Sequence, residues 1–224
     1  MSSETHLDNR LRLCAAFVRQ GARLADVGTD HAYLPVWLCR HGVCPSAIAA
    51  DINPAPLQRG QMTVEAAGLG DRVQTRLSDG LAAVGADEAD DIVIAGMGGE
   101  LIAAIIDRCP YAKRADKHFI LQPMTKSEQL VRYLCEKGFS IDKQDCCVAG
   151  GKCYTVMSVT YMGEGDGGEP DELFCYTGKL RPAENEIHLH FLRGHLDRLR
   201  KMALGDARYG VLADRLEAFC DGDT

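Results

Sequence analysis

The sequence lacks several features that define other classes of protein. Its first residues contain neither an apolar core nor a small-residue cleavage site, and no apolar run approaches the roughly 20 residues that cross a bilayer. No Cys-x-x-Cys pair occurs among the ten cysteines, so neither a disulfide framework nor a zinc site is predicted. We therefore expect a cytoplasmic protein with reduced thiols, no membrane partner and no metal.

A positive net charge is also missing. The formal charge is −7, and most of it lies after residue 160. This balance argues against a protein that coats nucleic acid through bulk electrostatics, although it leaves room for a local basic face.

Short apolar runs alternate with amphipathic stretches over the first 137 residues. The expected strands are residues 23–27, 47–50, 73–77, 91–95 and 118–122. The expected helices are residues 7–21, 33–41, 55–67, 99–108 and 126–137. Such alternation is typical of an α/β fold in which helices cover both faces of a parallel sheet.

The pattern changes after Gly138. Residues 140–148 and 152–161 are strand-like and are separated by only three small residues, which predicts an antiparallel hairpin that completes a seven-stranded, mostly parallel sheet. Class I methyltransferases have this arrangement, and other doubly wound enzymes also carry an antiparallel edge.

We predict three parts: a domain over 1–162, a Gly-rich and acidic linker over 163–171, and a C-terminal helical hairpin over 172–224. The two expected helices of this hairpin cover residues 181–202 and 207–219. The appendage fits a packing element, a dimer contact or a substrate-binding arm, and the sequence does not predict the oligomeric state.

The loop after the first expected strand is acidic and holds one glycine. It reads D-V-G-T-D-H over residues 26–31, so the G-x-G-x-x-G pattern that brings backbone amides to a pyrophosphate is absent. Acidic side chains at this end of a doubly wound sheet suit a ligand that has cationic groups and no phosphate. S-adenosylmethionine, which carries a sulfonium and an ammonium group, meets both conditions.

Two more acidic residues follow expected strands. Asp51 comes 25 residues after Asp26, near the spacing at which a carboxylate reaches ribose hydroxyls. Asp79 begins the motif D-G-L, in which the carboxylate could accept from an adenine amino group while Leu81 packs on the ring. Each acid alone could equally cap a helix, and three at successive strand ends favour a ligand site.

The fourth strand is expected to end in the Gly-rich turn I-A-G-M-G-G at residues 94–99, where the methyl donor should meet its acceptor. The alternative is a tight turn that needs positive φ. Gln122 at the tip of the fifth strand could hydrogen-bond a base edge, whereas Met124 is expected to serve packing.

The motifs D-V-G-T-D-H-A-Y-L-P, D-G-L, I-A-G-M-G-G and L-Q-P together resemble the bacterial tRNA (adenine-22 N1)-methyltransferases. The resemblance runs from Leu7 to about Tyr161. It implies a class I methyltransferase domain that uses S-adenosylmethionine and acts on tRNA. One departure lies in the hairpin, where an acidic residue beside a lysine and tyrosines is expected and the chain has A-G-G-K-C-Y at residues 149–154.

The resemblance also assigns roles by position. Cofactor contacts are expected from Asp26, Gly28, Thr29 and Asp30 for the methionine part, Asp51, Ile52 and Asn53 for the ribose, Asp79, Gly80 and Leu81 for the adenine, and Ala95 and Gly96 at the methyl-transfer end. The expected catalytic residues are Asp30, His31, Tyr33, Gly96 and Met97. Candidate phosphate contacts are Arg10, Arg12, Lys126, Arg132, Arg193, Arg198, Arg200 and Lys201.

Neutral adenine N1 carries an in-plane lone pair, so alignment can supply much of the acceleration without a strong base. A carboxylate near the acceptor would stabilise the cationic product, and Asp30 is the first candidate. Because N1 lies on the pairing edge, the target base must leave its stack. The rival functions are a methyltransferase acting on a small molecule or protein, and a non-catalytic protein that keeps the fold and binds RNA or a partner.

Overall fold

The computed structural model describes residues 6–163 and 170–222. Its strands are β1 (Leu24–Val27), β2 (Ala47–Asp51), β3 (Val73–Leu77), β4 (Asp91–Gly98), β5 (His118–Thr125), β6 (Phe139–Ala149) and β7 (Lys152–Tyr161). Its helices are α1 (Asn9–Phe17), α2 (Tyr33–Arg40), α3 (Pro54–Ala67), α4 (Gly99–Arg108), α5 (Ser127–Glu136), α6 (Glu172–Thr177), α7 (Glu186–Met202) and α8 (Arg208–Asp221).

All seven strands form one sheet in the order β3-β2-β1-β4-β5-β7-β6. The first five are parallel to one another, and β7 is antiparallel to both β5 and β6. The predicted α/β fold with a mostly parallel sheet and a terminal antiparallel hairpin is therefore confirmed. The chain adds β2 and β3 on one side of β1 and then β4 and β5 on the other, so the strand order reverses between β1 and β4. The crevice at the carboxyl ends of these two strands is the usual ligand position in such sheets.

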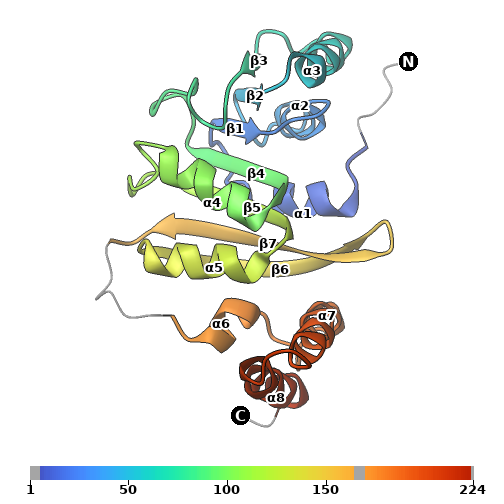
Figure 1. Cartoon of the computed structure of the whole chain (residues 1–224). Coiled ribbons are helices and arrows are strands. Elements are labelled where there is room, and N and C mark those ends of the chain that lie inside the picture. The colour runs from blue at the N-terminus through green and yellow to red at the C-terminus, as the bar shows by residue number, and fades with distance from the viewer. Residues whose placement is uncertain (1–5, 164–169, 223–224) are drawn as a thin grey trace.

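Helices cover both faces of the sheet (Figure 1). On one face, residues of α4 and α5 such as Ile102 and Leu130 pack against Ile94 and Leu121. On the other, residues of α1, α2 and α3 pack against the alternate side chains of the same strands, Val93 among them. The strands between these layers read as nearly continuous apolar runs because both faces are buried, as parallel sheets require.

The C-terminal helices α6, α7 and α8 lie beyond the β6 edge of the sheet (Figure 1). They share a separate apolar cluster with the hairpin, in which Leu192, Leu199 and Leu216 pack against Cys146 of β6. The prediction of only two helices here was wrong, because six residues after Asp171 form α6, whose first turn Asp171 caps. The predicted linker lies partly outside the described residues, and the division of the chain into domains stays a prediction.

Two further boundaries differ from expectation. Strand β4 continues through the predicted turn to Gly98, because it remains paired with β5 as far as Thr125 across an irregular register. Helix α7 begins at Glu186 rather than near residue 181, since the Asn185 side chain accepts the Ile187 amide and caps its first turn. Within the described residues, no helix is both long and apolar enough to span a membrane.

Candidate active site

A cavity of about 430 Å³ opens at the carboxyl ends of β1 and β4. The first residues of α1, Arg10 and Leu11, close one side, and the loop from β1 to α2 forms the other. Predicted site residues that line it are Asp26, Gly28, Thr29, Asp30, His31, Tyr33, Ala95 and Gly96. The sequence motifs after the first and fourth strands therefore meet in one place.

Asp26 is the most buried acidic group in this cavity, with 7% of its surface exposed. Burial raises the pKa of its carboxyl group to about 6, against smaller lowering effects from a hydrogen bond with Thr29 and the charge of Arg10. At neutral pH the group is still largely ionised. Within the described residues, Asp26 forms no ion pair. A buried carboxylate without such a partner is well suited to receive a cationic ligand group.

Two glycines bring backbone to the cavity wall. Gly28 has φ +79°, and a Cβ atom built on it would lie 2.1 Å from Cε of Met97. Gly96 has φ +81°, a conformation that side chains rarely adopt. The predicted site residue Met97 thus lies against Gly28 beneath the loop, and both turns depend on glycine to bring the chain close to a ligand.

Arg10 was predicted as a phosphate contact, and the structure places it in the cavity wall instead. Its Nη1 donates to Oε1 of Gln122 at 2.8 Å, and the same oxygen accepts from the Gly96 amide at 3.0 Å. The Gln122 amide nitrogen donates to the Pro123 carbonyl, so the fully buried Gln122 side chain has no group left for a base edge. The prediction for Gln122 was therefore wrong: it joins α1, β4 and β5 under the cavity.

The mouth of the cavity carries a carboxylate and two stacked rings. Asp30 is ion-paired with Arg59 of α3 and lies 3.4 Å from Nε2 of His31. The rings of His31 and Tyr33 stack with centroids 4.9 Å apart and planes 8° from parallel. Ala32 between them holds φ +54° while its amide is bonded to Thr29, so the loop is locally strained into this shape.

The residues predicted to hold a ribose lie at the carboxyl end of β2, next to β1 in the sheet, and do not line this cavity. Oδ1 of Asp51 accepts the Asn53 amide at 2.7 Å, which forms a tight turn before α3. Ile52 between them is 59% exposed and therefore available to a flat ligand. The second carboxylate oxygen of Asp51 has no hydrogen-bond or ion-pair partner among the described residues.

The residues predicted to hold an adenine are more widely separated. Asp79 forms two hydrogen bonds with Arg108 of α4, and Gly80 packs against Ile105 at φ +58°. Leu81 is buried in the α4 face of the core. In this arrangement these three residues hold the loop after β3 against α4, and their role toward a cofactor stays a prediction.

Several predicted phosphate contacts have partners within the protein. Arg200 pairs with Asp214 and Glu217, Arg132 pairs with Glu172, and Lys126 pairs with Glu100. Met124, expected to serve packing, is 42% exposed. No group of three or more metal-ligating side chains occurs in residues 6–163 and 170–222.

Comparison with known proteins finds methyltransferases. A family model described as a methyltransferase domain matches residues 7–157. The tRNA (adenine(22)-N(1))-methyltransferase of Bacillus subtilis is 34% identical over 155 residues, which cover 69% of this chain and only 65% of that protein.

Solved structures match over nearly the whole chain. The crystal structure of the B. subtilis M1A22 tRNA methyltransferase TrmK has a TM-score of 0.84 at 28% identity and covers 97% of this chain and 99% of that one. A candidate tRNA (m1A22) methyltransferase of Streptococcus pneumoniae, solved in complex with S-adenosyl-L-methionine, has a TM-score of 0.80 at 33% identity and covers 96% and 99%.

Proposed function

The chain belongs to the methyltransferase domain family, and from that premise we propose that it transfers a methyl group from S-adenosylmethionine to N1 of an adenine, at position 22 in the D-arm, of tRNA. The observation that carries the proposal is the cavity in which the buried Asp26, the Gly28 and Gly96 turns and the His31–Tyr33 stack come together. An enzyme with this substrate works where tRNA matures, so we also place it in the cytoplasm.

The charged residues of the cavity are suited to S-adenosylmethionine, a ligand that carries no phosphate. The Asp26 carboxylate suits the ammonium group, and the Arg10 guanidinium suits the carboxylate at the same end of the molecule. Asp51 and Ile52 follow the neighbouring strand, where a ribose and an adenine edge extend in folds of this kind. When bound, the cofactor supplies an electrophilic methyl group on its sulfonium.

The chain's own residues align the acceptor and balance its charge. The stacked His31 and Tyr33 rings offer a platform for an unstacked adenine at the cavity mouth. Asp30 lies at the same mouth, where its carboxylate stabilises the positive charge that develops on the base as N1 attacks. The ion pair with Arg59 keeps that carboxylate in position.

The proposal predicts 1-methyladenosine in the D-arm of an unmodified tRNA transcript incubated with methyl-labelled S-adenosylmethionine. Asp30→Asn should lower kcat about tenfold, a smaller loss than the ~100-fold typical of buried groups, because Asp30 is exposed. The dissociation constant of the cofactor should change less than about twofold, since Asp26 is unaltered. Nuclease digestion and mass spectrometry locate the product.

Asp116→Asn is the matched control, because it removes an exposed, arginine-paired carboxylate at the opposite end of β5. Label in a protein or a small molecule, and none in tRNA, would favour the rival methyltransferase function. Failure of the wild-type protein to bind S-adenosylmethionine would favour a non-catalytic protein with this fold.

The raised pKa of Asp26 predicts that cofactor affinity depends on pH. Protonation of the carboxyl group below about pH 6 removes the charge that attracts the ammonium, so the association constant should fall about tenfold per pH unit there and be flat above about pH 7. Isothermal titration calorimetry across this range measures the bend. In Asp26→Asn the bend should be absent, and a bend that persists in this variant assigns it to another group.

A further inference from the structure

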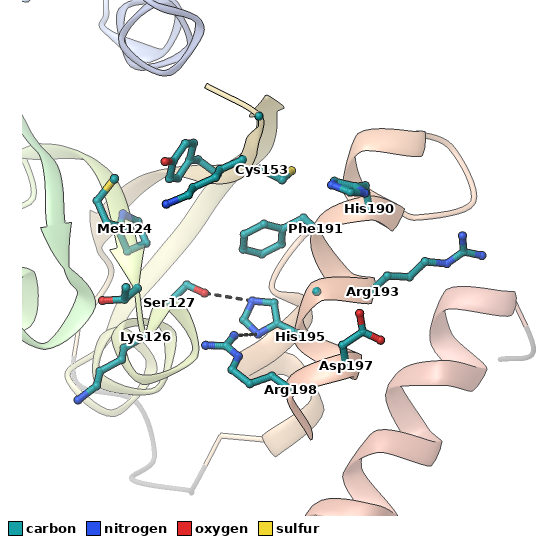
Figure 2. A pocket seen from close by; sticks show the side chains of 16 residues that line it. Met124, Lys126, Ser127, Cys153, His190, Phe191, Arg193, His195, Asp197 and Arg198 are labelled. Atoms are coloured by element: carbon teal, nitrogen blue, oxygen red, sulfur yellow. Dashed lines mark hydrogen bonds between the residues drawn. The ribbon is translucent and has the colours of Figure 1, made fainter. Parts of the chain in front are cut away.

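A second, larger cavity lies between the tip of β5, the β6–β7 turn and helix α7 (Figure 2). Its volume is about 610 Å³, and its walls come from residues 123–127, 151–154 and part of 190–198. We call it the α7 groove. Its volume is typical of ligand sites, and neither the cofactor nor the reacting base of the proposed function needs it.

The walls of the α7 groove are held in place by polar contacts between elements. The His195 ring receives a hydrogen bond from Arg198 at Nδ1 and shares a 3.3 Å contact between Nε2 and Oγ of Ser127. Burial lowers the pKa of His195 to about 3, so the ring stays neutral and bridges α7 to the start of α5. His188 of the same helix contacts Asp145 of β6 at 2.9 Å, which holds α7 against the hairpin. The groove is therefore preformed.

The charge of the α7 groove opposes that of the whole chain. Lys126, Lys152, Arg193 and Arg198 line it together with a single acidic residue, Asp197, in a protein of net charge −7. Of these cations, Lys126 is paired with Glu100 and Arg198 with Glu128. Within residues 6–163 and 170–222, no carboxylate lies within ion-pair distance of Lys152 or Arg193. Unpaired cations around a groove favour an anionic ligand.

The interior of the groove offers an apolar ring. Figure 2 shows Phe191 pointing from α7 into the space between Met124 and Cys153, while Arg193 extends from the same helix in the opposite direction. The Phe191 ring forms a T-shaped contact with His195, with centroids 4.9 Å apart. An aromatic face inside and cations outside match the base and the phosphates of single-stranded nucleic acid.

The tip of β5 connects this groove to the active site. Gln122 holds Arg10 and the Gly96 amide under the first cavity, and the next three residues line the α7 groove. Asn9, from the helix that carries Arg10, also donates to the Val148 carbonyl close to the β6–β7 turn. The active site and the groove are therefore joined by four consecutive residues of β5.

We propose that the α7 groove binds an unpaired nucleotide that flanks the target adenine, with its base stacked on Phe191 and its backbone phosphates at Lys152 and Arg193. This inference rests on the proposed function, since it requires an RNA substrate.

The test is the dissociation constant of an unmodified tRNA transcript for the full chain saturated with S-adenosylhomocysteine, measured over a range of KCl concentrations. Lys152→Ala combined with Arg193→Ala should raise the constant about tenfold and reduce the salt slope by about 1.4, because each phosphate contact contributes ~0.7 on a single strand. Phe191→Leu keeps packing volume, and it should raise the constant about fivefold without changing the slope.

Arg114→Ala combined with Lys137→Ala is the matched control, because it removes one arginine and one lysine that precede β5 and β6 at the opposite end of the sheet. This control variant should leave the dissociation constant of tRNA and its salt slope within about twofold of the wild-type values. Equal losses in the control and groove variants overturn the groove assignment, as does a groove variant that weakens S-adenosylhomocysteine binding. If the groove variants bind tRNA as tightly as the wild type while tRNA is methylated, the groove proposal fails and the proposed function stands. If the wild-type protein neither binds nor methylates tRNA, the groove proposal and the proposed function both fail.

Discussion

Replacing Asp26 by Asn should weaken S-adenosylmethionine binding roughly 100-fold or more, the effect of removing one partner from a buried charge pair. Asn has nearly the shape of Asp, so the substitution removes the charge and leaves the cavity in place. Binding of 5′-methylthioadenosine, which lacks the amino-acid end, should change less than about threefold. Isothermal titration calorimetry with both ligands at pH 7.5 measures the contrast.

Thermal and denaturant unfolding separate this effect from damage to the fold. Because burial raises the pKa of Asp26 to about 6, its carboxyl group contributes fully to stability below about pH 4, and that contribution is lost as the pH rises through 6. Asn does not ionise, so the variant does not lose this contribution to stability as the pH rises. At pH 7.5 the variant should therefore be as stable as the wild type or more stable, by up to about 3 kcal/mol. A clear loss of stability, or equal losses for both ligands, contradicts the assignment.

Much of the fold followed from local patterns. The five parallel strands, the helices α1 to α5 and the terminal hairpin were predicted near their observed positions, since buried strands carry continuous apolar runs that a single sequence displays. Helix α6 was missed because six residues are too few to show helical periodicity. The start of α7 carried a usable signal in Asn185, a residue type that caps helices, followed by an acidic first turn.

The candidate site was likewise predicted in part from local sequence patterns. Residues at the carboxyl ends of β1 and β4 line one cavity because these strands are neighbours, which the doubly wound pattern implies. The family resemblance and the fold class were confirmed by the comparisons. The roles of the residues after β2 and β3 stay predictions, because Asp51 and Asp79 have partners of their own within the protein.

Long-range packing explains what the sequence did not reveal. Arg10 lies 112 residues from Gln122, and their hydrogen bond exists because α1 packs on one face of the sheet with its first residues near the carboxyl ends of β4 and β5. No local motif distinguishes such an arginine from a surface cation. The α7 groove likewise depends on three segments that meet only when the C-terminal helices pack against the hairpin.

Replacing Arg10 by Met should weaken S-adenosylmethionine binding roughly 30-fold, the value of about 2 kcal/mol for a charged hydrogen-bonded contact. Met keeps most of the apolar length of the side chain, and Oε1 of Gln122 retains its bond from the Gly96 amide, so no buried acceptor is left without a donor. The affinity for decarboxylated S-adenosylmethionine, which keeps the ammonium and lacks the carboxylate, should stay within about twofold of the wild type.

The same ligand provides the control that separates the two charged residues of the cavity. Asp26→Asn should weaken binding of decarboxylated S-adenosylmethionine as strongly as that of the parent molecule, because both carry the ammonium. Arg10→Met should affect only the parent molecule. Equal losses for the two ligands in Arg10→Met would mean that Arg10 acts by positioning Gln122 and the Gly96 turn. A selective loss means that the guanidinium receives the carboxylate, so that α1, which precedes the sheet in the chain, supplies half of the binding site for the amino-acid end of the cofactor.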